Sequence, residues 1–153
     1  EDYIYITTPY FIPNDQILTA LQVASKSGVD VRILIPNESD SWTAKHATNS
    51  YLEQLFEANI KIYRYTKGFI HAKTMVVDGL FSTIGTSNMD YRSFNINFEI
   101  NALIYHKETS LLLKQDFMND LEYADLMNPE EWQKRSKWLK SQEAYARLWA
   151  PLL

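Results

Sequence analysis

The chain contains no cysteine, and this absence removes several kinds of chemistry at once. Without thiols the chain can form neither a disulfide scaffold nor a thiolate metal site, and it has no cysteine nucleophile. It also lacks a signal peptide, an initial methionine and any apolar run near the roughly 18 residues that cross a bilayer. We therefore expect a piece of a longer protein, with no bilayer-spanning segment within it.

Positive charge is scarce as well. The chain has 15 Lys and Arg against 19 Asp and Glu, which gives a formal net charge of -4. A protein that binds nucleic acid neutralises a run of phosphates with basic side chains, so we expect no nucleic-acid partner. With 153 residues, 46% of them hydrophobic, the chain is nevertheless large enough to fold around one ordinary core.

The hydrophobic pattern predicts an α/β fold. Strands are predicted from β-branched and aromatic runs at residues 3–6, 29–35, 60–65, 72–77, 80–84 and 98–105. Helical spacing, with Asn14 as N-cap and Gly28 as stop signal, predicts helices over residues 15–27 and 42–58. Strands that first alternate with helices and then follow one another imply a mixed β-sheet flanked by helices.

After residue 107 the pattern predicts a helical C-terminal tail over residues 107–153, broken near Pro129. The sequence has no linker, internal repeat or low-complexity segment. We therefore interpret residues 1–153 as a single domain.

One set of polar residues carries chemistry. His71 and Lys73 are two apart on the predicted strand, so both side chains should lie on one face, and Asp78 follows them. A Gly-Thr-Ser-Asn turn at residues 85–88 comes after the next strand, and Glu99 after that. Backbone N–H groups, hydroxyls and an amide suit the oxygens of a phosphate. A lone strand histidine or lysine is more often structural, but this combination at fixed spacing predicts a phosphoryl-transfer site.

The pattern His-x-Lys-x4-Asp followed by Gly-Thr-Ser-Asn resembles the signature of the phospholipase D superfamily. The flanking phrases resemble the C-terminal half of the bacterial cardiolipin synthases, and they span nearly the whole chain. These phrases lie at residues 8–13, 28–32, 68–73, 89–94, 97–101 and 147–153.

This resemblance implies a mechanism in which His71 attacks a phosphodiester and a histidine from a second motif protonates the leaving alcohol. It implies phosphate binding by Lys73 and Asn88, with hydroxyl contacts from Thr86 and Ser87. Its acidic residue, Glu99, would orient the His71 ring. Asp78 belongs to the signature, but its position across a turn favours an ion pair or turn capping over proton transfer. The resemblance implies neither cofactor nor metal.

The implied reaction joins two phosphatidylglycerol molecules to cardiolipin and releases glycerol. The implied partners are anionic phospholipid, a membrane surface, and a second motif-bearing half or a homodimer. The implied location is the cytoplasmic face of a bacterial cell membrane, in the full-length protein. Two alternatives stay open: another phospholipase D-type activity (lipid hydrolysis, phosphatidylserine synthesis or nuclease action), and a non-catalytic phosphate-binding module.

Other residues have less specific interpretations. His46 could contact a head group or lie on a solvated helix face, and His106 is expected to be exposed. Arg92 could pair with a carboxylate of the site or form an ordinary surface salt bridge. Tyr10 and Phe11 could line a lipid entrance or pack in the core.

Three tryptophans recur in the predicted tail among basic side chains, at positions 132, 138 and 149. This composition suits a membrane interface, and it equally suits a packed amphipathic helix.

Overall fold

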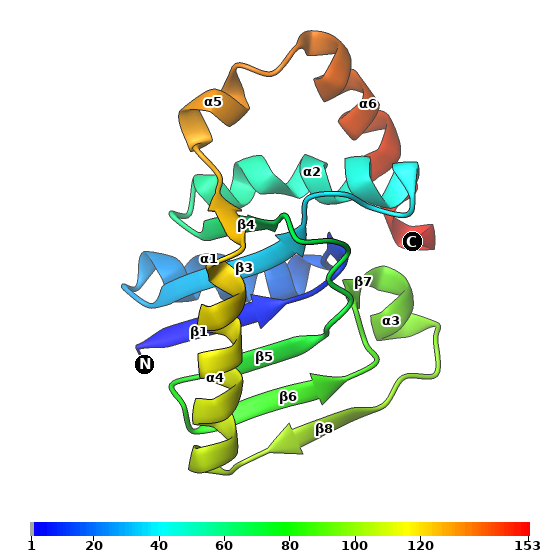
Figure 1. Cartoon of the computed structure of the whole chain (residues 1–153). Helices are drawn as coiled ribbons and strands as arrows, with labels where there is room; N and C mark the ends of the chain where they lie inside the picture. Colours follow the sequence, from blue (N-terminus) through cyan, green and yellow to red (C-terminus); the bar gives the residue numbers. More distant parts are fainter. Residues whose placement is uncertain (1) are drawn as a thin grey trace.

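A seven-stranded mixed sheet organises the chain, in the strand order β8-β6-β5-β1-β3-β4-β9 (Figure 1). The computed structural model describes residues 2–153. Its strands are β1 (Tyr3–Thr7), β3 (Asp30–Pro36), β4 (Lys61–Tyr65), β5 (Thr74–Val77), β6 (Phe81–Gly85), β8 (Asn101–Ile104) and β9 (Ala124–Leu126). Central strand β1 pairs parallel with β3 and antiparallel with β5, so the prediction of a mixed sheet flanked by helices is confirmed.

Helices cover both faces of this sheet, with α1 behind it and α4 in front in Figure 1. The helices are α1 (Asp15–Lys26), α2 (Trp42–Phe56), α3 (Tyr91–Asn95), α4 (Lys107–Leu121), α5 (Pro129–Gln133) and α6 (Lys137–Arg147), followed by the 3-10 turn η1 (Ala150–Leu152). The predicted caps are present: Asn14 accepts a hydrogen bond from Ile17 N at 3.0 Å, and Gly28 has φ +97°. Both ends of α1 thus follow from local sequence.

Alternation along β1 explains why the chain has a large core and a smaller one. Ile6 points into the large core, which the side chains of α1, α2 and α6 also enter, whereas Tyr5 points to the opposite face. There Tyr5 stacks on Phe117 of α4, with ring centroids 4.9 Å apart. Because successive side chains of a strand point to opposite faces of the sheet, β1 contributes to both cores, and α4 is the helix that covers the face of Tyr5.

The predicted helical tail is wrong at one point, because residues 124–126 form the edge strand β9. β9 pairs antiparallel with β4, and flanking backbone hydrogen bonds run from Thr66 N to Tyr123 O and from Met127 N to Ile62 O, both at 2.9 Å. A strand of three residues has no readable periodicity of its own. It forms because β4 offers it an unpaired edge.

Three further short elements were not predicted. Strand β2 (Phe11–Ile12) pairs parallel with β7 (Met89–Asp90) in a separate two-stranded sheet, and helix α3 begins directly after β7. Asp90 caps α3 by accepting a hydrogen bond from Ser93 N at 2.8 Å. These elements draw the segment after β6 over the carboxyl end of β1.

The end of the chain packs on α2 through charged groups. Arg135 contacts Glu53 of α2 at 3.4 Å and Glu143 of α6 at 2.9 Å, and Glu143 is 2% exposed. Arg147 donates to Ser50 O at 3.2 Å, and Trp132 packs against the large core. For Trp132 the packing alternative is therefore correct. Among residues 2–153, no helix has the length and apolar character that crossing a membrane requires.

Strands β6 and β8 approach unusually closely at Gly85. A Cβ built on Gly85 would lie 2.0 Å from Asn101 Oδ1 and 2.2 Å from the backbone oxygen of Ile100. Real Cβ atoms do not approach a backbone oxygen this closely, so any side chain here must push the two strands apart.

We therefore expect Gly85→Ala to lower the free energy of unfolding by about 3 kcal/mol, because the added methyl group meets backbone. Ala102→Ser, an exposed change on β8, is the matched control and should cost less than about 0.5 kcal/mol. Urea denaturation followed by circular dichroism measures both. Equal midpoints for the two variants would contradict the close approach.

Candidate active site

His71 and Lys73 lie side by side just before β5. The Nζ of Lys73 lies 3.0 Å from Nδ1 and 3.1 Å from Nε2 of His71, and it donates to His71 O at 2.9 Å. The predicted strand from residue 72 is wrong, because β5 begins only at Thr74. Residue 72 would have to pair with Pro9 of the outgoing β1 chain, and proline has no N–H for the ladder. Residues 71–73 lie outside the strand, yet the side chains of His71 and Lys73 lie on the same side of the chain, as their spacing predicted.

The turn after β6 places Thr86, Ser87 and Asn88. Thr86 N donates to Ile100 O at 3.0 Å, Ser87 N to Asn101 Oδ1 at 3.4 Å, and Asn88 N to Ser93 Oγ at 3.2 Å. The backbone of the turn is thus held by the start of β8, by the residue before it and by α3. The side-chain oxygen of Asn88 is enclosed but has no hydrogen-bond partner in residues 2–153. An enclosed polar atom without a partner is costly.

Glu99 joins this turn from the loop before β8. Its carboxylate accepts hydrogen bonds from the hydroxyl of Thr86, from Asn97 Nδ2 at 3.3 Å and from Ser93 Oγ at 3.5 Å. Within residues 2–153 it has no hydrogen bond to His71, so the orienting role stays a prediction. Sequence reasoning missed Ser93, which is buried and contacts both Asn88 and Glu99. Its signal was the phrase Asp-x-Arg-Ser at residues 90–93.

The electrostatics of Lys73 fit an anion site. Burial lowers the pKa of Lys73, and the nearby carboxylates of Glu99 and Asp90 oppose that shift. A partly desolvated ammonium group beside an exposed imidazole can hold the oxygens of a phosphate more strongly than a fully hydrated lysine can. The cluster therefore combines a nucleophile, a cation and hydrogen-bond donors.

Asp78 lies outside this cluster. Its backbone has φ +53°, and its side chain accepts hydrogen bonds from the N–H groups of Asp2 at 2.8 Å and Tyr3 at 2.9 Å. The bonds from these N–H groups lower the pKa of Asp78. The contacts match the turn-capping alternative, because they fasten the β5–β6 turn to the start of β1.

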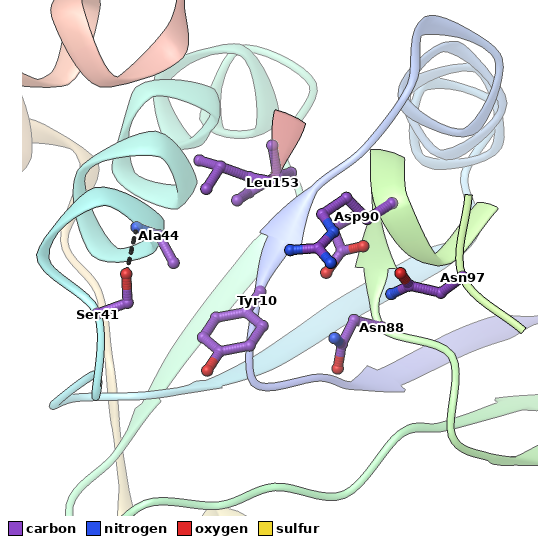
Figure 2. Close-up of a pocket in the computed structure, with 9 residues that line it drawn as sticks. Tyr10, Ser41, Ala44, Asn88, Asp90, Asn97 and Leu153 are labelled. Atoms are coloured by element: carbon purple, nitrogen blue, oxygen red, sulfur yellow. Dashed lines mark hydrogen bonds between the residues drawn. The ribbon is translucent and has the colours of Figure 1, made fainter. Parts of the chain in front are cut away.

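A polar pocket of about 290 Å³ opens beside Asn88, between β2, the start of α2 and α3 (Figure 2). We call it the polar pocket after its polar lining residues, but apolar residues line it as well: the polar ones are Tyr10, Ser41, Asn88, Asp90, Arg92 and Asn97, and the apolar ones are Ile12, Ala44 and Leu153. The hydroxyl of Tyr10 donates to Asp40 at 2.5 Å, and burial raises the pKa of Tyr10. Arg92 forms no ion pair within residues 2–153, so neither pairing considered for it is present. Phe11 is a core residue, with no exposed surface.

The remaining histidines serve local structure. His46 Nδ1 lies 2.8 Å from Trp42 O, and its ring stacks on Trp42. His106 is exposed, as expected, and caps α4 by accepting a hydrogen bond from Thr109 N. The chain has three histidines, so the cluster holds a single imidazole. No group of three or more potential metal ligands occurs in the described part of the chain.

Solved structures share this fold. Nuc from Salmonella typhimurium, a phospholipase D family member, superimposes with a TM-score of 0.71 at 21% identity, over 83% of this chain and 82% of that chain. Phosphatidylserine synthase from Haemophilus influenzae gives a TM-score of 0.78 at 16% identity, over 100% of this chain but 42% of that chain. At such identities the likeness concerns the fold alone.

Curated relatives are much closer in sequence. Cardiolipin synthases from Halalkalibacterium halodurans and Listeria monocytogenes are 47% identical over 150 residues, which is 98% of this chain. The chain spans only 30% to 31% of the length of these relatives. A family model described as "Cardiolipin synthase, PLD-like domain" matches residues 1–121. The chain therefore belongs to the phospholipase D-like domain family of the cardiolipin synthases.

Proposed function

We propose that the chain is the second-motif half of a cardiolipin synthase, a phosphatidyltransferase that joins two phosphatidylglycerol molecules. The contact between His71 and Lys73, beside the turn that presents Asn88, is the observation that carries this proposal. The 47% identity with proteins named cardiolipin synthase supports the choice of reaction within the superfamily. The net charge of -4 disfavours the nuclease alternative.

In the proposed first step an imidazole nitrogen of His71 attacks the phosphorus of one phosphatidylglycerol. A P–N bond forms, the P–O bond to the head-group glycerol breaks, and a second histidine protonates the leaving oxygen. In the second step the glycerol hydroxyl of another phosphatidylglycerol attacks, the P–N bond breaks, and the second histidine removes the proton. The P–N bond conserves the free energy of the ester, so the transfer requires no nucleotide.

Charge in the transition state develops on the non-bridging phosphate oxygens. Lys73 would supply a cation there, Asn88 an amide donor, and Thr86 and Ser87 hydroxyl or backbone donors. The adjacent polar pocket would take the glycerol head group, because hydroxyls need donors and acceptors such as Tyr10 and Asn97.

The second histidine must come from another unit, and one edge of the sheet is suited to receive it. β8 is an edge strand. Exposed apolar side chains lie along it and along the segments on either side of it, at Ile96, Phe98, Ile100, Leu103 and Tyr105. We call this set the β8 edge. An apolar strip of this kind on an unpaired edge is typical of an interface. Since the relatives are about three times as long as the chain, we propose that their remaining part supplies the second motif here, in preference to a homodimer.

The function is tested by comparing the chain alone with the chain joined to an upstream motif-bearing half from one of the relatives. We expect the monomeric chain to form no cardiolipin from phosphatidylglycerol and the joined protein to form it. His71→Ala should lower kcat at least about a thousandfold, because it removes the covalent nucleophile. His106→Ala, which changes only a helix cap, is the control. Cardiolipin formation by a chain shown by light scattering to be monomeric would contradict the proposal.

Lys73 and Glu99 should separate binding from turnover in the joined protein. Lys73→Met should weaken binding of tungstate, a phosphate mimic, about tenfold, because it removes the cation. Glu99→Gln should lower kcat about a hundredfold, because a neutral amide stabilises a protonated imidazole poorly. Its tungstate affinity should stay within about threefold, because glutamine can still accept the Thr86 hydroxyl. If Glu99→Gln lowered the tungstate affinity as much as kcat, the role of Glu99 would be to hold the turn at residues 85–88 and not to orient His71.

Tungstate binding should also depend on pH through Lys73. The protonated amine binds the anion, so affinity should fall as pH rises through the pKa of Lys73. Since burial lowers that pKa, the fall should occur below the ordinary value of 10.5. Calorimetric titrations of the 153-residue chain between neutral pH and this value measure the effect. A fall of the same size in Lys73→Met would show that another group is responsible.

A further inference from the structure

Four aromatic side chains lie exposed on α2, on α6 and just after α6, at the end of the molecule opposite to β8 in Figure 1. Trp138 is 71% exposed and Tyr145 56%, and Trp42 and Trp149 are about half exposed. We call these four residues the aromatic surface. Trp42, Trp138 and Tyr145 also border a shallow hollow of about 260 Å³. Large aromatic side chains usually bury most of their area, so a cluster of this kind marks a surface that contacts something else.

The opposite side of α6 explains why these residues face outward. Glu143 and Ala146 are buried, and Arg135 holds Glu143 at 2.9 Å while reaching Glu53 of α2 at 3.4 Å. Trp138 and Tyr145 are seven residues apart, so they share one stripe of the helix, on the other side from these contacts. Trp138 and Tyr145 are therefore exposed because the opposite side of α6 packs against the rest of the protein.

The charge around the aromatic surface is positive, although the chain as a whole is negative. Residues 134–153 contain five basic side chains and one acidic side chain, Glu143, which is buried. Lys134, Lys137 and Lys140 form no ion pair within residues 2–153. Two acidic side chains lie near Trp42 in the sequence: Glu38 pairs with Lys45, and Asp40 accepts the hydroxyl of Tyr10. Tryptophan and tyrosine beside lysine are typical of the membrane–water interface.

The aromatic surface also borders the candidate site. Trp42 directly follows Ser41 in the sequence, and Ser41 and Ala44 line the polar pocket next to Asn88 (Figure 2). We propose that the aromatic surface docks on an anionic lipid bilayer, with its aromatic rings among the head groups and its lysines at the lipid phosphates. This inference rests on the proposed function and deepens it, because docking there would bring the mouth of the pocket to the lipid.

Vesicle sedimentation tests the docking directly. The probe is the 153-residue chain carrying His71→Ala, so no turnover can alter the lipid. We expect binding to equimolar phosphatidylglycerol–phosphatidylcholine vesicles at least about tenfold tighter than binding to phosphatidylcholine alone. Three of the four tryptophans belong to the aromatic surface, so brominated lipid should quench their fluorescence on binding.

Matched variants assign the binding to the surface. Trp138→Gln with Trp149→Gln should weaken it at least about tenfold, because apolar area drives insertion. Lys137→Gln with Lys140→Gln should weaken it about thirtyfold and reduce its salt dependence. Val23→Ser, at an exposed position on α1, and Phe98→Ser, at the β8 edge, should each change it by less than about twofold. Circular dichroism confirms the folding of each variant, and the lysine pair keeps the test valid if the tryptophan pair misfolds.

Equal binding to both vesicle types, or binding unchanged by the two paired variants, would overturn the inference. So would binding lost in Phe98→Ser, since the β8 edge would then be the surface that meets lipid. Turnover of detergent-dispersed phosphatidylglycerol by the joined protein, with His71 intact, measures the proposed function separately. Vesicle binding without such turnover would contradict the proposed reaction but not the proposed docking. Turnover without vesicle binding would contradict only the docking by the aromatic surface.

Discussion

The close approach of β6 and β8 at Gly85 is the constraint on which the candidate site depends. On one side Gly85 N donates to Lys73 O at 3.2 Å, which ties the lysine to the end of β6. On the other side the backbone of Gly85 lies against Ile100, whose N–H donates to Thr86 Oγ1 at 3.0 Å. Lys73, Thr86 and Glu99 thus converge because one residue without a side chain lets three segments meet.

Most of the fold could be predicted because its main elements carry their signals locally. The cap at Asn14 and the apolar strands 29–35 and 60–65 agree with the structure to within one or two residues. The elements that could not be predicted are those that depend on a distant partner. β9 exists because β4 has a free edge, and the pairing of β5 with β1 begins only at Thr74 because Pro9 cannot extend the ladder.

The site shows the same division. The spacing of His71, Lys73 and the turn at residues 85–88 predicted a cluster, and the structure brings these residues close together. Ser93 and Asn97 could not be placed from sequence, since they reach Glu99 only after α3 folds over the end of β1. Asp78 belongs to the same signature but caps a turn. One sequence motif can therefore contain both residues of the site and residues that stabilise the surrounding fold.

The candidate site lacks one of the two histidines that the proposed reaction requires. The cluster holds one imidazole, while the proposed transfer needs a nucleophile and a proton donor on opposite sides of the phosphorus. The exposed side chains of the β8 edge and of the aromatic surface lie far apart, since β8 is at the bottom and α6 at the top of Figure 1, so a second half and a lipid surface could be engaged at the same time.

The central claim is that His71 becomes covalently bonded to phosphorus. The most direct measurement is mass spectrometry of the chain joined to a second motif-bearing half, quenched rapidly during turnover of phosphatidylglycerol. The account predicts an acid-labile, base-stable phosphoryl adduct on His71. An adduct on a different residue of this chain, or full turnover by His71→Ala, would contradict it.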